Sequence, residues 1–154
     1  MTDPITYPYR TEAHGFPLLF AGQAQKEFTV NETICLIDAL MTRTVKASLD
    51  APPAEPAEGA CYRVLEGATG EWSGKDRTIA ARVGGGWHFV SPCEGMQVFD
   101  QAVGCWLHFE GDWNAAGEPI APQGGAVVDL EARAAIAQLT DALRTLGLFS
   151  QAQA

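Results

Sequence analysis

Long apolar runs, clustered basic residues and closely spaced cysteines are all missing from this 154-residue sequence. No stretch of about 18 apolar residues occurs, so a membrane-spanning helix is not expected. The first residues lack the basic and apolar regions of a secretory signal peptide, so Sec export is not expected either. Lys and Arg number 10 against 19 Asp and Glu. This net charge of −9, without a basic cluster, argues against nucleic-acid binding, which needs clustered cations.

The cysteines are few and widely spaced. None forms a C-x-x-C pair, so a zinc ribbon is not expected and a disulfide framework would be thin for this length. Because a free cysteine packs as a small hydrophobe, we expect mainly buried thiols. The four are Cys35, Cys61, Cys93 and Cys105.

Composition and length together predict an α+β protein with one modest core and extensions. Charged residues amount to only 19%, and 16 Gly with 9 Pro favour short strands and turns over a helical bundle. We expect an N-terminal arm and helix over residues 1–50. A small antiparallel β-sheet or barrel of about five short strands is expected over 51–114. A loop and a C-terminal amphipathic oligomerisation helix are expected over 115–154.

The first 20 residues are predicted to form an arm. Prolines and a glycine lie among aromatic residues there, which favours an extended course over a helix or an independent strand pair. Such an apolar segment is expected to pack on its own domain or on a neighbouring subunit. Its apolar side chains are Tyr7, Tyr9, Phe16, Leu18, Leu19 and Phe20.

A helix is predicted after the arm, beginning near Val30 behind a capping box made by Thr29 and Glu32. Apolar residues at spacings of three and four form one stripe, widened by Leu36 and Leu40. We expect either the β part or the same helix in another copy to cover much of this helix. The stripe comprises Val30, Ile34, Ile37, Met41 and Val45.

The strands are predicted after a linker-like, proline-rich stretch at residues 51–59. Short apolar runs alternate with turn residues, which is the pattern of an antiparallel sheet packed on a helix. The five predicted strands are 61–65, 78–83, 87–90, 96–100 and 105–109.

Residues 128–148 predict a second helix, with Asp129 as N-cap and Gly147 near its end. Its apolar residues follow the 3-4-3 spacing of a coiled-coil seam, which Ala132 extends backwards. Docking on its own domain and formation of an oligomer seam both stay open. The predicted oligomer interface comprises Ile136, Leu139, Leu143 and Leu146.

No constellation of catalytic groups stands out, so we predict neither a catalytic residue nor a metal or cofactor. His88 and His108 could meet near Cys93 or Cys105, but no spacing matches a zinc site. No Ser lies in a G-x-S-x-G elbow, and no glycine run carries the lysine of a phosphate loop. Carboxylates in Gly-rich turns leave a small glycan hydrolase as a remote alternative. The pairs are Glu66 with Glu71 and Glu110 with Asp112.

Tryptophans are the best candidates for recognition, because flat aromatic faces stack on sugars or anchor protein interfaces. We expect Trp87 and Trp106 to be buried, whereas Trp72 and Trp113 lie in Gly-flanked turns. The predicted ligand or receptor contacts are Trp72, Trp113 and Trp87.

Over roughly residues 15–110 the chain resembles an uncharacterised domain family of alphaproteobacterial prophages and gene transfer agents. The most specific part is the run GFPLLFAGQAQKE at 15–27, followed by segments such as 67–72, 85–89 and 92–96. Many members have Trp or Tyr where this chain has Met96. The resemblance implies a virion component, commonly a tail fibre or host-contact protein, with no catalytic residues assigned.

We therefore predict a structural component of a phage or phage-like particle, namely a tail fibre, tail-tip or spike subunit involved in host attachment, and not an enzyme. It is expected to be a homotrimer, made in the bacterial cytoplasm and located in the virion. Expected partners are other tail or baseplate proteins and a host cell-surface glycan, with no nucleic acid and no membrane insertion. The alternative is a carbohydrate-binding module that recognises host surface polysaccharide.

Overall fold

A computed structural model describes residues 9–20, 22, 26–121, 123–124 and 129–150. Predictions for Tyr7, residues 23–25 and Val128 lie outside this part of the chain. The helices and strands form an α+β fold, which confirms the predicted class. The chain divides into two compact units, Met1–Pro92 and Cys93–Ala154. The division falls inside the segment 51–114 that the sequence predicts as one β domain.

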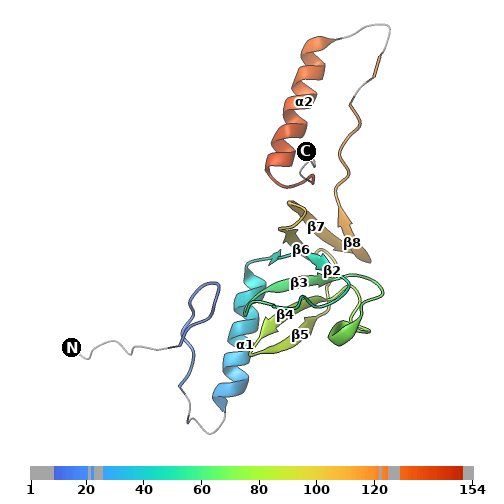
Figure 1. Ribbon diagram of the computed structural model, residues 1–154. Coiled ribbons are helices and arrows are strands. Elements are labelled where there is room, and N and C mark those ends of the chain that lie inside the picture. The colour runs from blue at the N-terminus through green and yellow to red at the C-terminus, as the bar shows by residue number, and fades with distance from the viewer. Residues whose placement is uncertain (1–8, 21, 23–25, 122, 125–128, 151–154) are drawn as a thin grey trace, which may run out of the picture. The chain divides into compact units, whose positions relative to one another are not determined.

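Unit 1 contains a small sheet with the strand order β2-β3-β4-β5 (Figure 1). β2 pairs with β3 in parallel, whereas the β3-β4 and β4-β5 pairs are antiparallel. Gly84 and Gly85 form the tight turn between β4 and β5, and their positive φ angles of 62° and 76° favour glycine there. The strands of this unit are β1 (Thr44–Val45), β2 (Ser48–Leu49), β3 (Cys61–Val64), β4 (Ile79–Val83) and β5 (Gly86–Val90).

The core of unit 1 lies on one face of this sheet. Tyr62, Ala80 and Phe89 are cross-strand neighbours, so they share a face. The loop after β3 contributes the 3₁₀-helix Gly70–Trp72, and Trp72 joins this core. The buried cluster is Ala60, Tyr62, Val64, Ala68, Trp72 and Ala80, with Leu49, Trp87 and Phe89 packed against it.

The helix α1 (Lys26–Met41) contacts residues of β3 and β5 that alternate with the core residues. The Cys61 thiol donates to the carbonyl oxygen of Ala39 over 3.6 Å. The ring Nδ1 of His88 lies 3.4 Å from Glu32 Oε1. Since neighbouring strand residues point to opposite faces, α1 packs on the face opposite the aromatic core.

The helix begins at Lys26, earlier than the sequence predicts. The Glu27 carboxylate explains this start, because it accepts a hydrogen bond of 2.9 Å from the backbone N–H of Gly22. Thr29 lies inside the helix, so the predicted capping box is wrong. Val45 is not helical either, because it belongs to β1.

The N-terminal arm forms a small hairpin, closed by a β-bridge between Arg10 and Pro17. The predicted extended course is therefore wrong for this segment. α1 holds the hairpin through the Asn31 side chain, which accepts from the N–H of Leu19 at 2.8 Å and donates to its carbonyl oxygen at 3.0 Å.

Asp38 of α1 is the second anchor of the hairpin. Its buried carboxylate accepts from the backbone N–H groups of Ala13 (2.7 Å) and His14 (2.9 Å), and His14 Nδ1 lies 2.9 Å away. Burial by itself raises the pKa of Asp38, but the hydrogen bonds from Ala13, His14 and Thr11 outweigh it and hold this pKa below its usual value. The described part of the arm thus packs on its own unit.

The proline-rich stretch 51–59 is fastened to unit 1. The N–H of Gly59 donates to Arg82 O at 2.8 Å. The Glu58 carboxylate accepts from the N–H groups of Gly84 and Gly85 in the β4-β5 turn. The stretch is therefore a fixed loop of this unit.

Unit 2 contains an antiparallel meander, in which β6, β7 and β8 pair in that order, and the helix α2 (Leu130–Thr145). The predicted N-cap is confirmed, because the Asp129 carboxylate accepts from the N–H of Ala132 at 2.9 Å. The strands are β6 (Gln97–Asp100), β7 (Cys105–Glu110) and β8 (Asp112–Ala115).

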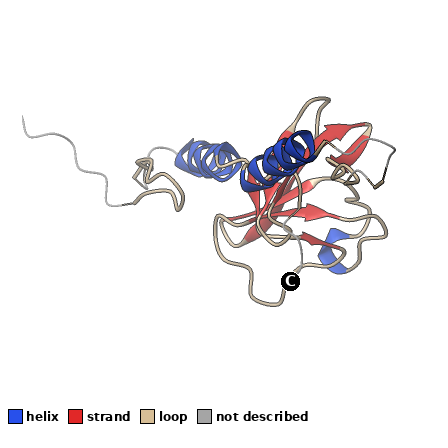
Figure 2. Ribbon diagram, turned by 90° about the horizontal axis from the view of Figure 1, so that it is seen from above, coloured by secondary structure: helices blue, strands red, loops and turns tan. Residues whose placement is uncertain are grey.

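All five predicted strands are present, whereas β1, β2 and β8 were not predicted. The strands belong to two small sheets that do not close, so the barrel alternative is wrong (Figure 2). Neither described helix has the length and apolar character that crossing a membrane requires.

Candidate functional site

Trp72 is a core residue of unit 1 with 0% of its surface exposed. Its ring centroid lies 5.0 Å from that of Trp87, edge to face, and 5.9 Å from that of Tyr62. No acceptor for its indole N–H is found among the described residues. The predicted role of Trp72 as a ligand contact is wrong for this structure, because the surrounding side chains cover both ring faces and edge.

Trp113 is also inaccessible, with 8% of its surface exposed. It lies in β8 and not in a turn, and its ring packs at 5.4 Å on Phe109, its cross-strand partner in β7. The fourth tryptophan, Trp106, is partly buried against Phe99 at 5.4 Å. A sugar therefore has no free face of Trp113 on which to stack.

Trp87 is the predicted contact residue that keeps accessible surface. It lies in β5, half-buried, and its ring makes edge-to-face contacts with Tyr62 and Trp72 of the aromatic core. The Arg82 guanidinium lies 5.3 Å from its ring centroid, within the range of a cation–π contact. Because the guanidinium lies over the ring, it occupies one face of Trp87.

The two histidines considered for a metal site, His88 and His108, belong to different units. His88 belongs to unit 1 and pairs with Glu32, whereas His108 belongs to unit 2 and lies 3.7 Å from Glu110. Within the residues that the structure describes, no group of three or more His, Cys, Asp or Glu is placed to hold a metal ion.

The carboxylates considered for glycan hydrolysis lie on the surface and make local contacts. Glu66 Oε1 lies 3.5 Å from Arg77 Nε, and the Asp112 side chain accepts from the next backbone N–H at 2.7 Å. Glu71 and Glu110 are exposed. None of these four lines a cavity described in this structure.

Two thiols are shielded from nucleophilic chemistry. Burial raises the pKa of Cys61 to about 11. Burial also raises the pKa of Cys35, with Glu58, Asp38 and Glu12 adding to the effect. Both thiols are thus protonated near neutral pH, which disfavours nucleophilic attack. Cys105 is buried as predicted, whereas Cys93 is exposed.

The strongest candidate for function is the apolar seam of α2. None of the described residues of this helix is buried. Leu139 is 61% exposed and Leu146, just beyond the helix, 66%. The seam is defined here as Ile136, Leu139, Leu143 and Leu146. Leu143 is partly buried, whereas the other three side chains are exposed.

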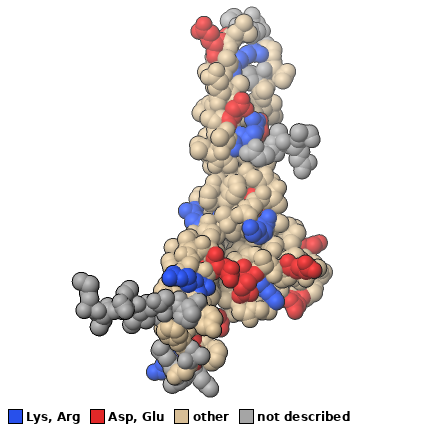
Figure 3. Space-filling model, turned by 60° about the vertical axis from the view of Figure 1, so that its left-hand side comes forward, with Lys and Arg blue, Asp and Glu red and all other residues tan. Residues whose placement is uncertain are grey.

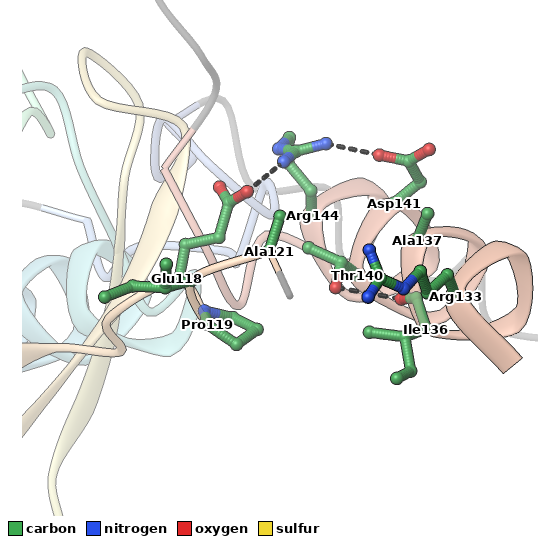
Figure 4. Close-up of a pocket in the computed structure, with 10 residues that line it drawn as sticks. Glu118, Pro119, Ala121, Arg133, Ile136, Ala137, Thr140, Asp141 and Arg144 are labelled. Carbon is green, nitrogen blue, oxygen red and sulfur yellow. Dashed lines mark hydrogen bonds and ion pairs between the residues drawn. The ribbon is translucent and has the colours of Figure 1, made fainter. Parts of the chain in front are cut away.

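One flank of α2 is occupied by the segment before it (Figure 4). The Arg144 guanidinium lies between two carboxylates and donates to Asp141 and Glu118 at 2.5 Å each. Arg133 Nη2 donates to Gly124 O at 2.6 Å. A groove of about 310 Å³ remains between segment and helix, with apolar walls from Pro119, Ile120, Ile136 and Ala137.

Within unit 2, hydrogen bonds fix the C-terminal end of α2. The N–H of Gly147 donates to Arg144 O at 2.9 Å and that of Leu148 to Leu143 O at 3.0 Å, which is the Schellman pattern. The backbone N–H of Trp106 donates to the carbonyl oxygen of Gly147 at 2.7 Å. A Cβ at position 147 would lie 2.7 Å from the Phe99 ring, so glycine is needed there.

Comparison with known proteins yields one family. A family model described as "Protein of unknown function (DUF2793)" matches residues 30–114, more than half of the chain. The match runs from within α1 to within β8. No curated protein matches the sequence.

Proposed function

Since the chain belongs to the DUF2793 family, whose description names no activity, its role must be inferred from its surface, and we propose that it is a structural subunit of a phage or phage-like particle. It would act as a tail fibre, tail-tip or spike subunit. The observation that carries this proposal is the distribution of exposed large apolar side chains. Among the described residues, the exposed large apolar side chains lie on the two helices or in segments next to them, except Val103, which lies in a turn. None of them lies in a strand.

The exposure of α2 supports self-association. An isolated helix of about 15 residues is marginal in water, and helices in proteins are held mainly by packing of an apolar face. α2 has 16 residues and buries none of them within the described chain. Packing of the seam against the same seam in other copies supplies the missing burial. We expect a trimer, formed at the chain end that carries α2.

Attachment to the host is assigned to unit 1. Trp87 with Arg82 offers the accessible aromatic surface, and the sequence resembles prophage and gene-transfer-agent proteins. In Figure 3 Asp and Glu gather on one part of the face, with Lys and Arg beside them, and much of the rest is uncharged. Net negative charge disfavours non-specific adsorption to anionic cell surfaces, so a specific contact is needed.

The mass of the purified chain in solution tests the self-association. Light scattering at micromolar concentration should give three times the chain mass. Leu139→Glu combined with Leu143→Glu should reduce this mass, because charges would be buried in the seam. Gln138→Glu, an exposed position off the seam, should leave it unchanged. A wild-type monomer would refute the oligomer.

The location in a particle requires a second experiment. Electron microscopy of particles made with and without this protein should show a missing projection in the second case, restored when the gene product is supplied. Particles that never contain the protein would refute the structural role.

Binding of the labelled chain to host cells should fall on Trp87→Ala, and unchanged binding would refute the glycan contact.

A further inference from the structure

The N-terminal hairpin, defined here as residues 9–19, lies beside α1 and has little apolar burial (Figure 1). Thr11 is its one buried residue, and Tyr9 keeps 65% of its surface exposed. In the neighbouring sheet, by contrast, four of the five residues of β4 are buried. Because burial of apolar surface is the main favourable term in folding, the hairpin is held less firmly than the sheet. Its half-buried apolar side chains are Phe16, Leu18 and Leu19.

Two hollows separate the hairpin from the rest of unit 1. The larger, of about 570 Å³, lies between Tyr9 and Leu19 of the hairpin, α1 and the β4-β5 turn. The smaller, of about 160 Å³, lies between hairpin residues 10–12, α1 and the proline-rich loop. Cys35 of α1 and Val83 of β4 line both hollows. Side chains that line such space lack contacts on one side, so dispersion contributes little to holding the hairpin.

Hydrogen bonds to two side chains of α1 take the place of apolar packing. The Asp38 carboxylate accepts from two backbone N–H groups of the hairpin and is bound by two of its side chains. The Asn31 side chain binds the N–H and the carbonyl oxygen of one further residue. The described hydrogen bonds between the hairpin and the rest of unit 1 all end on these two side chains. The hairpin residues that take part are Thr11, Ala13, His14 and Leu19.

Further hydrogen bonds close the hairpin on itself. The N–H of Thr11 donates to Phe16 O at 2.9 Å, and that of Leu18 donates to Tyr9 O at 3.0 Å. The N–H of Phe16 donates to the Thr11 hydroxyl at 2.9 Å. These bonds are internal to the hairpin, so separation from α1 does not require them to break.

We propose that the hairpin is a detachable strap, which opens away from α1 as one unit while the sheet of unit 1 stays folded. Regions with few buried apolar contacts open at a lower free energy than the whole protein needs to unfold. Opening returns the buried Asp38 carboxylate to water, which solvates its charge. It also joins the two hollows into one cleft along α1, lined by Cys35. The strap acts within one chain, so it does not depend on the proposed role in a particle.

Native-state hydrogen exchange of the full chain tests the opening. The amides of Ala13, His14 and Leu19 should be protected at least about tenfold less than the amide of Val64, which lies in β3 and donates to Thr78 O. Low concentrations of urea should speed exchange at Val64 and hardly change it in the hairpin, because opening exposes little surface. Equal protection and equal urea dependence at all four amides would overturn the strap, because the hairpin would then open only when the unit unfolds.

Two variants test whether the hairpin opens as one unit. Asp38→Asn should speed exchange at Leu19 by the same factor as at the two amides that Asp38 binds. Asn31→Ala should speed exchange at these two amides by the same factor as at Leu19. The Val64 amide should stay the better protected one in both variants, which shows that the unit is folded. Faster exchange confined to the residues whose partner was removed would overturn the concerted opening.

A disulfide between the hairpin and the proline-rich loop should hold the strap closed. A Cβ added at Gly59 would lie 3.0 Å from the Glu12 Cβ, so a small shift gives the separation of about 3.5–4.5 Å that a disulfide needs. In a Cys35→Ser, Cys93→Ser background, oxidised Glu12→Cys, Gly59→Cys protein should lose the fast exchange at Leu19. The reduced form should regain it, and this form controls for strain at position 59, where φ is 75°. Fast exchange that continues after oxidation would overturn the opening.

Discussion

The two helices have the same length, 16 residues, yet they are held in different ways. α1 buries Glu27, Asp38 and Ala39 against its own unit, whereas Val30, Ile37 and Met41 are exposed. No residue of α2 is fully buried, and the helix is fixed mainly at its C-terminal end, with a preceding segment on one flank. The comparison teaches that apolar periodicity locates a helix but does not say which face the domain uses.

The largest expected effect concerns the aromatic core of unit 1, on the sheet face opposite α1. Trp72→Ala should lower the free energy of unfolding by about 3–5 kcal/mol, because it empties a fully buried site. Trp72→Phe should cost much less, since no hydrogen bond of the indole is lost among described residues. Leu139→Ala on α2, at low concentration, is the matched control and should have little effect. Urea denaturation measures all three.

A smaller loss of stability is expected when a polar side chain that attaches α1 to the hairpin is replaced. Asp38→Asn should cost about 2–3 kcal/mol, because an amide cannot accept both backbone N–H groups of the hairpin. Asp50→Asn, at an exposed position, is the control. Equal stability of the two variants would contradict the role assigned to Asp38.

The pH dependence of the same contact has a defined sign. The pKa of Asp38 is lowered in the folded state, so its contribution is present above the unfolded pKa of about 4 and is lost as the pH falls through the folded pKa. The stability difference between wild type and Asp38→Asn should therefore shrink below about pH 4. A difference that stays constant from neutral pH to well below that value would contradict this linkage.

The smallest expected effect on stability concerns Gly147, at the C-terminal end of α2. Gly147→Ala should cost about 1–2 kcal/mol from its φ of 74° alone, and contact with the Phe99 ring adds to this. Gly117→Ala has free space and no positive φ, so it serves as control. Thermal unfolding measures the difference, and a Gly147→Ala chain as stable as the control would refute the anchor.

Local patterns predicted much of the fold. Five strands, the Asp129 cap and the Gly147 helix end follow from side-chain alternation, capping chemistry and glycine's freedom at positive φ. The start of α1 was missed because Glu27 acts through a contact with Gly22, outside the predicted capping box. β1 and β2 were missed because a two-residue strand is defined only by its partner.

The recognition site was predicted less well. Trp72 and Trp113 follow or flank glycines, a pattern that suggests exposed turns, but neighbouring strands and loops close over both. The α2 seam was predicted from its heptad spacing alone. The outward direction of the α1 stripe was left open, because the polar partners of Asp38 and Asn31 lie 12 to 25 residues away in the chain.

The sequence by itself determined where helices and strands form, since capping, alternation and turn preferences act between near neighbours. It also determined the acidic charge and the presence of two aliphatic stripes. Only the tertiary structure decided which tryptophan stays accessible and which helix face is left uncovered, because burial depends on contacts between residues far apart in the chain.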